Sequence, residues 1–235
     1  MAIGARTLSG PRLPPARGTA THLVVLLHGY GADGNDLIGL APHWQRDLPG
    51  VAFAAPNAPE PCAGAPTGYQ WFPISRMNPA EMVRGVESAA SLVNGFVDAE
   101  LARLELPADR LALVGFSQGT MMSLHVGLMR ATKPAAVIGY SGMLPGAENI
   151  SQLPPGVPPI LLVHGDADPM IPADAMFASA SGLGRAGATV QWHLSLGVGH
   201  GIDPVGLAMG GDFLRMAFRG QLRPRANEIA CPLPR

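Results

Sequence analysis

GFSQG, residues 115–119, stands between an apolar run and an amphipathic one, and this junction decides the fold. The preceding run, residues 110–115 (RLALVG), has the unbroken apolar character of a buried strand. The following run, residues 118–131, repeats apolar residues at helical spacing. A G-x-S-x-G sequence between a strand and a helix is typical of a sharp turn that exposes a nucleophilic serine. The alternative is a serine N-cap with glycines for packing. We expect Ser117 to be the nucleophile.

Short apolar runs alternate with helix-length segments along the whole chain. Strands are expected at 22–28, 51–55, 110–115, 135–140, 160–164 and 189–196, and helices at 36–47, 79–104, 118–131, 173–186 and 206–219. This order predicts an α/β fold with a mostly parallel, doubly wound sheet. Ligands of such sheets bind outside the carboxyl ends of the strands, so the functional residues should gather there.

The composition bounds the organisation of the chain. With 235 residues, 47% of them hydrophobic, one α/β domain over 1–235 is expected, its core at about 20–220 and an extended tail at 222–235. A net charge of −1 and the lack of a basic stripe argue against nucleic acid. No signal peptide or membrane span is recognisable, so a soluble cytoplasmic protein is expected. We expect a monomer or a homodimer. Cys62 and Cys231 fit no metal or redox spacing. We expect two thiols, with a disulfide between them as the alternative, and no metal.

A serine nucleophile needs a base, and the base needs a carboxylate to orient it. Among seven histidines, His200 stands in a glycine-rich loop after the last expected strand, long enough to reach over the strand ends, whereas His164 ends a strand and is set aside. Asp166 and Asp168 both follow the strand at 160–164. Asp168, whose following proline stiffens the turn, is favoured as the orienting carboxylate, and Asp166 as a turn-former, with the two still open at this point.

The loop after the first long strand, HGYG at 28–31, is expected to supply a hydrogen-bond donor for the oxyanion of the reaction. Its glycines permit a tight backbone, in which the amide of Tyr30 can donate to an oxyanion. The amide of Gln118, at a helix N-terminus, is the second expected donor. His28 is interpreted as fixing the backbone of this loop.

Joined in this order, the motifs resemble those of a known family. LLHGYGADGNDLIGLAP, RLALVGFSQGTMMSL, YSGMLP, LLVHGDADPMIP and GVGHGI are similar to those of the phospholipase/carboxylesterase group of α/β-hydrolases, from about residue 22 to 219. The resemblance implies an α/β-hydrolase fold without a large cap domain. It also implies Ser117, Asp168 and His200 as a triad, and the amides of Tyr30 and Gln118 as the oxyanion hole. Thr120 departs from the family, whose members commonly have glycine there.

The segment 56–78 is expected to wall the substrate pocket, with Trp71 and Phe72 as apolar contacts and with Met143 and Met170 as further substrate-binding candidates. Packing within a surface loop is the alternative for the two aromatic residues. The whole pattern predicts a serine carboxylesterase that hydrolyses short to medium acyl esters through an acyl-enzyme, without a cofactor. The alternatives are an acyl-protein thioesterase or lysophospholipase with the same triad and, more remotely, a hydrolase fold that binds ligands without turnover.

Overall fold

The computed structural model describes residues 7–62, 67–75, 78–150 and 153–222. Cys231 and the expected tail beyond residue 222 lie outside these residues. Cys62 is buried and its thiol is free.

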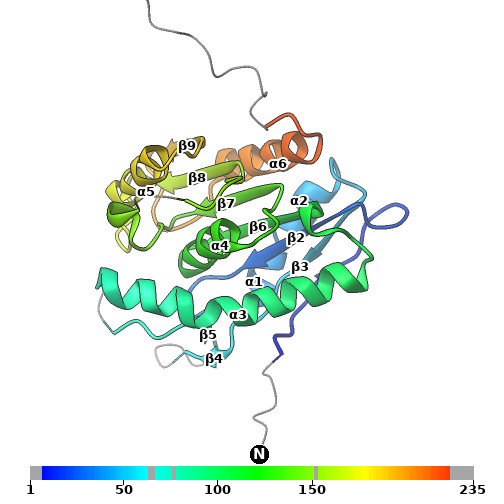
Figure 1. Ribbon diagram of the computed structural model, residues 1–235, viewed down its shortest axis with the longest axis horizontal. Coiled ribbons are helices and arrows are strands. Elements are labelled where there is room, and N and C mark those ends of the chain that lie inside the picture. The colour runs from blue at the N-terminus through cyan, green and yellow to red at the C-terminus, as the bar shows by residue number, and fades with distance from the viewer. Residues whose placement is uncertain (1–6, 63–66, 76–77, 151–152, 223–235) are drawn as a thin grey trace, which may run out of the picture.

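One sheet of seven strands, in the order β1-β3-β2-β6-β7-β8-β9, forms the centre of the protein (Figure 1). The short β1 runs antiparallel to β3, and the other neighbours are parallel. The strands are β1 (Arg12–Leu13), β2 (His22–Leu27), β3 (Val51–Ala54), β6 (Leu111–Phe116), β7 (Ala136–Tyr140), β8 (Ile160–Gly165) and β9 (Val190–Ser195). All six predicted strands are confirmed, and the edge strand β1 is an addition.

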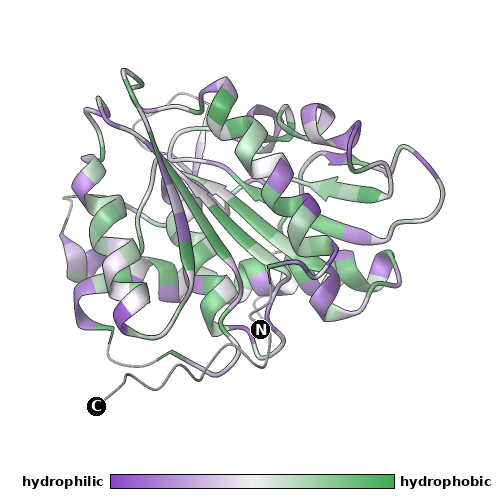
Figure 2. Ribbon diagram, turned by 90° about the horizontal axis from the view of Figure 1, so that it is seen from above, coloured by the Kyte–Doolittle hydropathy of each residue, from purple (hydrophilic) through white to green (hydrophobic). Residues whose placement is uncertain are grey.

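Helices cover both faces of the sheet, as its apolar strands require. They are α1 (Gly34–Ile38), α2 (Ala41–Gln45), α3 (Pro79–Arg103), α4 (Gln118–Met129), α5 (Ala173–Arg185) and α6 (Pro204–Phe218), with 3-10 turns η1 (Ala108–Arg110) and η2 (Ala147–Asn149). In β2, Leu23 and Val25 pack toward α3 and α4, whereas Val24 and Leu26 pack toward α2 and α6. Figure 2 shows the resulting hydrophobic centre along the strands. Of the helices in the described ranges, none is long and apolar enough to cross a membrane.

Two local features differ from the sequence predictions. The helix expected at 36–47 is two short helices, because Pro42 in the first turn of α2 has no N–H to continue the helical hydrogen bonds. The segment 56–78 contains a small antiparallel hairpin of β4 (Glu60–Pro61) and β5 (Tyr69–Gln70). A bridge from Tyr69 to Ala32 ties this hairpin to the loop after β2.

Charged residues are distributed unequally between the helix ends. The first turns of α1, α3 and α5 carry Asp36, Glu81 and Asp174. The last turns of α3, α5 and α6 carry Arg103, Arg185 and Arg215. Each sign complements the helix dipole. Because these helices return from the carboxyl ends of the strands to the amino ends, the acidic turns share the edge of the sheet where β6, β8 and β9 end.

Candidate active site

The turn between β6 and α4 holds Ser117 in a strained backbone conformation. Its φ is 54° and its ψ −117°, a region that residues other than glycine seldom occupy, at a cost of about 1–3 kcal/mol. Two glycines permit the close approach of strand and helix. A Cβ at Gly115 would overlap the carbonyl of Gly119, and a Cβ at Gly119 would overlap the carbonyl of Leu27. The strand, turn and helix predicted around GFSQG are therefore present.

Thr120 fills the underside of this turn. Its methyl group occupies space left by Gly139 and Gly142, where a Cβ would meet the threonine side chain. Its hydroxyl is buried, 2.9 Å from the carbonyl oxygen of Gly115 and 2.8 Å from that of Tyr140. The same carbonyl of Tyr140 accepts from the N–H of Ser117 over 2.9 Å. Thr120 thus links β6 and β7 to the serine turn through the carbonyls of Gly115 and Tyr140.

Asp168 and His200 meet at the same edge of the sheet. Nδ1 of His200 lies 2.7 Å from Oδ2 of Asp168, and the carboxylate is fully buried whereas the imidazole is 17% exposed. Oδ1 of Asp168 accepts from the N–H groups of Met170, over 2.8 Å, and Ile171, over 3.0 Å. Burial alone would raise the pKa of Asp168, but the hydrogen bonds from Ile171, His200 and Met170 outweigh burial and lower it. The carboxylate is therefore ionised at neutral pH.

The imidazole of His200 lies beside the serine turn. Its ring packs against Phe116, the residue before Ser117, with ring centroids 5.0 Å apart. The hydroxyl of Ser141, at the end of β7, donates to the carbonyl of Gly201 over 2.9 Å and so anchors the histidine loop. With Nδ1 bound to Asp168, Nε2 is the nitrogen left to accept a proton.

Asp166 occupies a different position from Asp168. Its side chain is exposed and accepts from the N–H of Gly197 over 2.6 Å. This bond joins the loop after β8 to the loop after β9 without reaching His200. The geometry places Asp166 away from His200, and its side chain links two loops instead of making the local turn that was expected.

The loop after β2 is held by His28, which is fully buried. Nε2 of His28 accepts from the N–H of Ala58 over 2.9 Å, so Nδ1 carries the hydrogen and donates to the carbonyl of Gly29 over 2.7 Å. Burial lowers the pKa of His28 despite the opposing effect of the Gly29 bond. The carbonyl of Gly29 and the N–H of Tyr30 belong to one rigid peptide plane. The same carbonyl also accepts from the N–H of Ala32 over 3.2 Å. Neutral His28 therefore helps to set the direction of the Tyr30 amide.

The side chain of Gln118 is buried and connects the serine turn to the 69–72 segment. Its Oε1 accepts from the N–H of Trp71 over 2.9 Å, and its Nε2 donates to the carbonyl of Phe72 over 2.7 Å. The indole N–H of Trp71 in turn donates to the carbonyl of His28 over 2.9 Å. One hydrogen-bond network thus joins the two segments that carry the expected oxyanion donors.

The sequence profile described as phospholipase/carboxylesterase matches residues 10–218. The chain belongs to the phospholipase/carboxylesterase family. The structure of esterase PE8 is 39% identical, with a TM-score of 0.84 over 90% of this chain and 100% of that chain. Acyl-protein thioesterase 1 of Schizosaccharomyces pombe is 34% identical over 181 residues, which are 72% of this chain and 78% of the yeast protein. At 16% identity, the Bacillus cereus carboxylesterase shares the fold, with a TM-score of 0.72 over 89% of this chain and 94% of its own. The α/β-hydrolase fold is confirmed, and the protein is an esterase or thioesterase family hydrolase.

In this phospholipase/carboxylesterase family member, two of the expected pocket residues are buried. Trp71 is 2% exposed and Phe72 is 1% exposed, both within the core beside α3 and α4. The ring of Phe72 lies where Gly85 of α3 has no side chain, which explains its burial. Both rings pack in the core, and their assignment as apolar contacts of the substrate stays a prediction. Met143 is half-buried against the same core, and Met170 is 66% exposed after Asp168.

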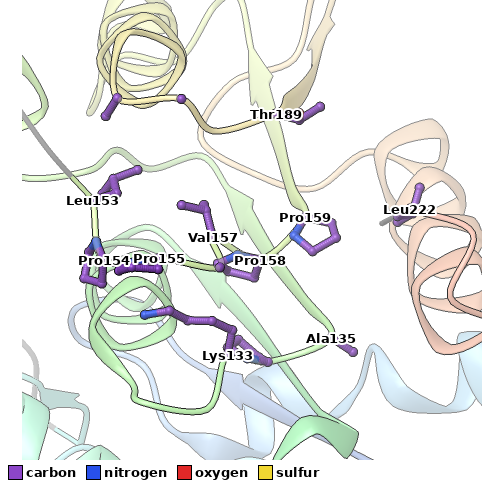
Figure 3. A pocket seen from close by; sticks show the side chains of 14 residues that line it. Lys133, Ala135, Leu153, Pro154, Pro155, Val157, Pro158, Pro159, Thr189 and Leu222 are labelled. Atoms are coloured by element: carbon purple, nitrogen blue, oxygen red, sulfur yellow. The ribbon is translucent and has the colours of Figure 1, made fainter. Parts of the chain in front are cut away.

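Figure 3 shows a hollow of about 620 Å³ beside the segment 153–159. Its lining residues adjoin the amino ends of β7, β8 and β9, at the edge of the sheet opposite Ser117. It is lined by the proline-rich segment 153–159, with Lys133, Thr189 and Leu222 nearby. Nζ of Lys133 already donates to the carbonyls of Leu128 and Arg130 at the end of α4. Because it lies at the amino ends of the strands, this hollow is separate from the candidate site. Across the described ranges, no three His, Cys, Asp or Glu side chains group as metal ligands would.

One residue that the sequence analysis set aside reaches the site. Nε2 of His164 lies 3.2 Å from Oδ2 of Asp168. Only the four-residue spacing between His164 and Asp168, across a tight loop, could have indicated this contact.

Proposed function

We propose that this protein is a serine carboxylesterase in which Ser117, His200 and Asp168 form the triad. The contact of His200 Nδ1 with the buried Asp168, beside the strained turn of Ser117, is the observation that carries the proposal. A carboxylate at Nδ1 holds the histidine in the tautomer whose Nε2 can accept the serine proton. The three residues come from the ends of β6, β8 and β9, in the chain order typical of this fold.

The reaction proceeds through an acyl-enzyme. Nε2 of His200 takes the proton of Ser117 as Oγ attacks the ester carbonyl, and Asp168 stabilises the imidazolium. The amides of Tyr30 and Gln118 receive the oxyanion, the second of them at the N-terminus of α4. The C–O bond to the alcohol then breaks, and the alcohol leaves with the proton from Nε2. Water repeats the sequence, frees the acid and restores the serine, so no cofactor is required.

Short to medium acyl esters are the proposed substrates. The connections after β8 and β9 span only residues 166–172 and 196–203, which supports a shallow site over Asp168 and His200. Each buried methylene contributes about 0.8 kcal/mol, so preference should rise with acyl length until the apolar contact ends. Met170 and Met143 are the proposed contacts. The similarity to acyl-protein thioesterase 1 of Schizosaccharomyces pombe supports the alternative, an acyl-protein thioesterase. A lysophospholipase would use the same triad.

The test is kcat/KM for p-nitrophenyl esters from acetate to palmitate and for matched acyl thioesters, with Ser117→Ala measured alongside. We expect a maximum at short or medium esters and background activity in the variant. An active Ser117→Ala protein would overturn the mechanism. A maximum at palmitate, or faster turnover of thioesters, would replace the substrate class with one of the alternatives.

A further inference from the structure

His164, in β8, is buried next to the candidate triad yet has no part in the mechanism above. Its side chain is 1% exposed, and its Nε2 lies 2.8 Å from the carbonyl oxygen of Ile171 and 3.2 Å from Oδ2 of Asp168. Both partners are hydrogen-bond acceptors. Nε2 must therefore carry the hydrogen and share it between them.

The other ring nitrogen defines the state of this histidine. Nδ1 of His164 is buried and has no hydrogen-bond partner among the described residues. A hydrogen at Nδ1 would find no acceptor, whereas a lone pair there costs less to leave unpaired. The arrangement thus favours a neutral ring that donates from Nε2.

The carboxylate of Asp168 is consequently surrounded by N–H groups. Oδ1 receives the backbone N–H groups of Met170 and Ile171, and Oδ2 lies within reach of both His164 and His200. Three of these four donors come from β8 and the loop that follows it. These three donors hold the plane of the Asp168 carboxylate independently of His200.

We propose that His164 is a positioning residue of the triad, acting through Asp168. Its Nε2–H fixes Oδ2 in the one direction from which His200 is held beside Ser117. This inference rests on the proposed function and adds to it a residue that never touches the substrate. Placement errors of about 1 Å at a reacting group cost about 10²-fold in rate, so a loosened carboxylate should act on kcat rather than on KM.

The test compares His164→Leu with His164→Gln, because the glutamine amide can place an N–H close to the position of Nε2. We expect His164→Leu to lose about 10- to 100-fold in kcat with KM within about twofold, and His164→Gln to keep most of the activity. Both changes are then repeated on Asp168→Ala. There, His164→Leu should change kcat by less than about threefold, because the residue through which it acts is gone.

Three results would overturn the inference: an unaltered kcat in His164→Leu, a glutamine variant as impaired as the leucine variant, or a full-sized leucine effect on Asp168→Ala. If thermal melting shows that His164→Leu is poorly folded, the inference is tested instead with the glutamine variant. The measurement there is the low-field proton resonance of His200 Nδ1–H. That resonance should persist in His164→Gln, and its loss there would count against the inference. An active Ser117→Ala protein would instead refute the proposed function, so the two failures are distinguishable.

Discussion

The buried imidazole of His28 donates to the carbonyl oxygen of Gly29, its neighbour in the chain, over 2.7 Å. Because this carbonyl shares a peptide plane with the amide of Tyr30, a buried side chain helps to orient a proposed oxyanion donor. Trp71 and Gln118 extend the same network to the second proposed donor.

We predict that His28→Ala lowers kcat by about 10- to 100-fold with little change in KM, because the Tyr30 amide loses its orientation. Removing an oxyanion donor outright costs about 10²–10³-fold, and displacement should cost less. His125→Gln is the matched control, since His125 is another histidine whose pKa burial lowers, on α4. Steady-state kinetics on one short ester measure both. If kcat fell equally in both variants, the loss would reflect the removal of a buried histidine and not the orientation of the Gly29–Tyr30 peptide plane.

The two aspartates after β8 should separate by function. Asp168→Asn should lose about 10²–10⁴-fold in kcat, because an amide at this position favours the wrong tautomer of His200. Asp166→Asn should keep most activity, because its carboxylate only bonds the N–H of Gly197. Kinetics of both variants, with thermal melting to check folding, provide the comparison. The reverse ranking would show that the orienting carboxylate is misassigned.

Thr120 should matter for stability through its hydroxyl. Thr120→Val keeps the shape of the side chain but removes the donor to Gly115 and Tyr140. The carbonyl of Tyr140 keeps the N–H of Ser117 as a donor, so the variant loses one shared buried hydrogen bond. We expect this loss to lower the free energy of unfolding by about 0.5–1.5 kcal/mol. Thr120→Ser keeps the hydroxyl and loses only a methyl group. Urea unfolding measures both variants. A larger loss of unfolding free energy in Thr120→Ser than in Thr120→Val would contradict the stabilising role of the hydroxyl.

Acid should destabilise the fold through His22. Burial and then the charge of Arg110 lower the pKa of His22 from 6.5 to about 4. Between these values the unfolded chain binds a proton that the folded chain does not, so the free energy of unfolding falls as pH drops from 6.5 to 4. Urea unfolding at pH 7.5 and pH 5 should show a smaller drop for His22→Gln than for the parent. His43→Gln, at an exposed histidine, is the control, and it should match the parent.

The elements around Ser117 could be predicted because short buried runs and their order determine where strands end. Asp168 and His200 follow from the same rule, since each stands in the loop directly after a strand. Trp71 and Phe72 could not be assigned, because their burial depends on the core formed with α3, whose Gly85 leaves room for the ring of Phe72. The contact of His164 with Asp168 depends on how tightly the loop after β8 turns, and the chain order does not contain that information.

The unequal charges of the helix ends give this nearly neutral chain an electrical polarity. With a net charge of −1, the protein as a whole has little attraction to a charged surface. Acidic residues begin α1, α3 and α5 at the edge that holds Ser117. Arginines end α3, α5 and α6 at the other edge, where Arg103 and Arg215 are paired with Glu100 and Asp212 and Arg185 has no carboxylate partner among the described ion pairs. On a cationic bead the molecule should settle with Ser117 against the matrix, and on an anionic bead with Ser117 toward the solution. At equal amounts of bound protein, the immobilised enzyme should therefore hydrolyse ester faster on the anionic support than on the cationic one.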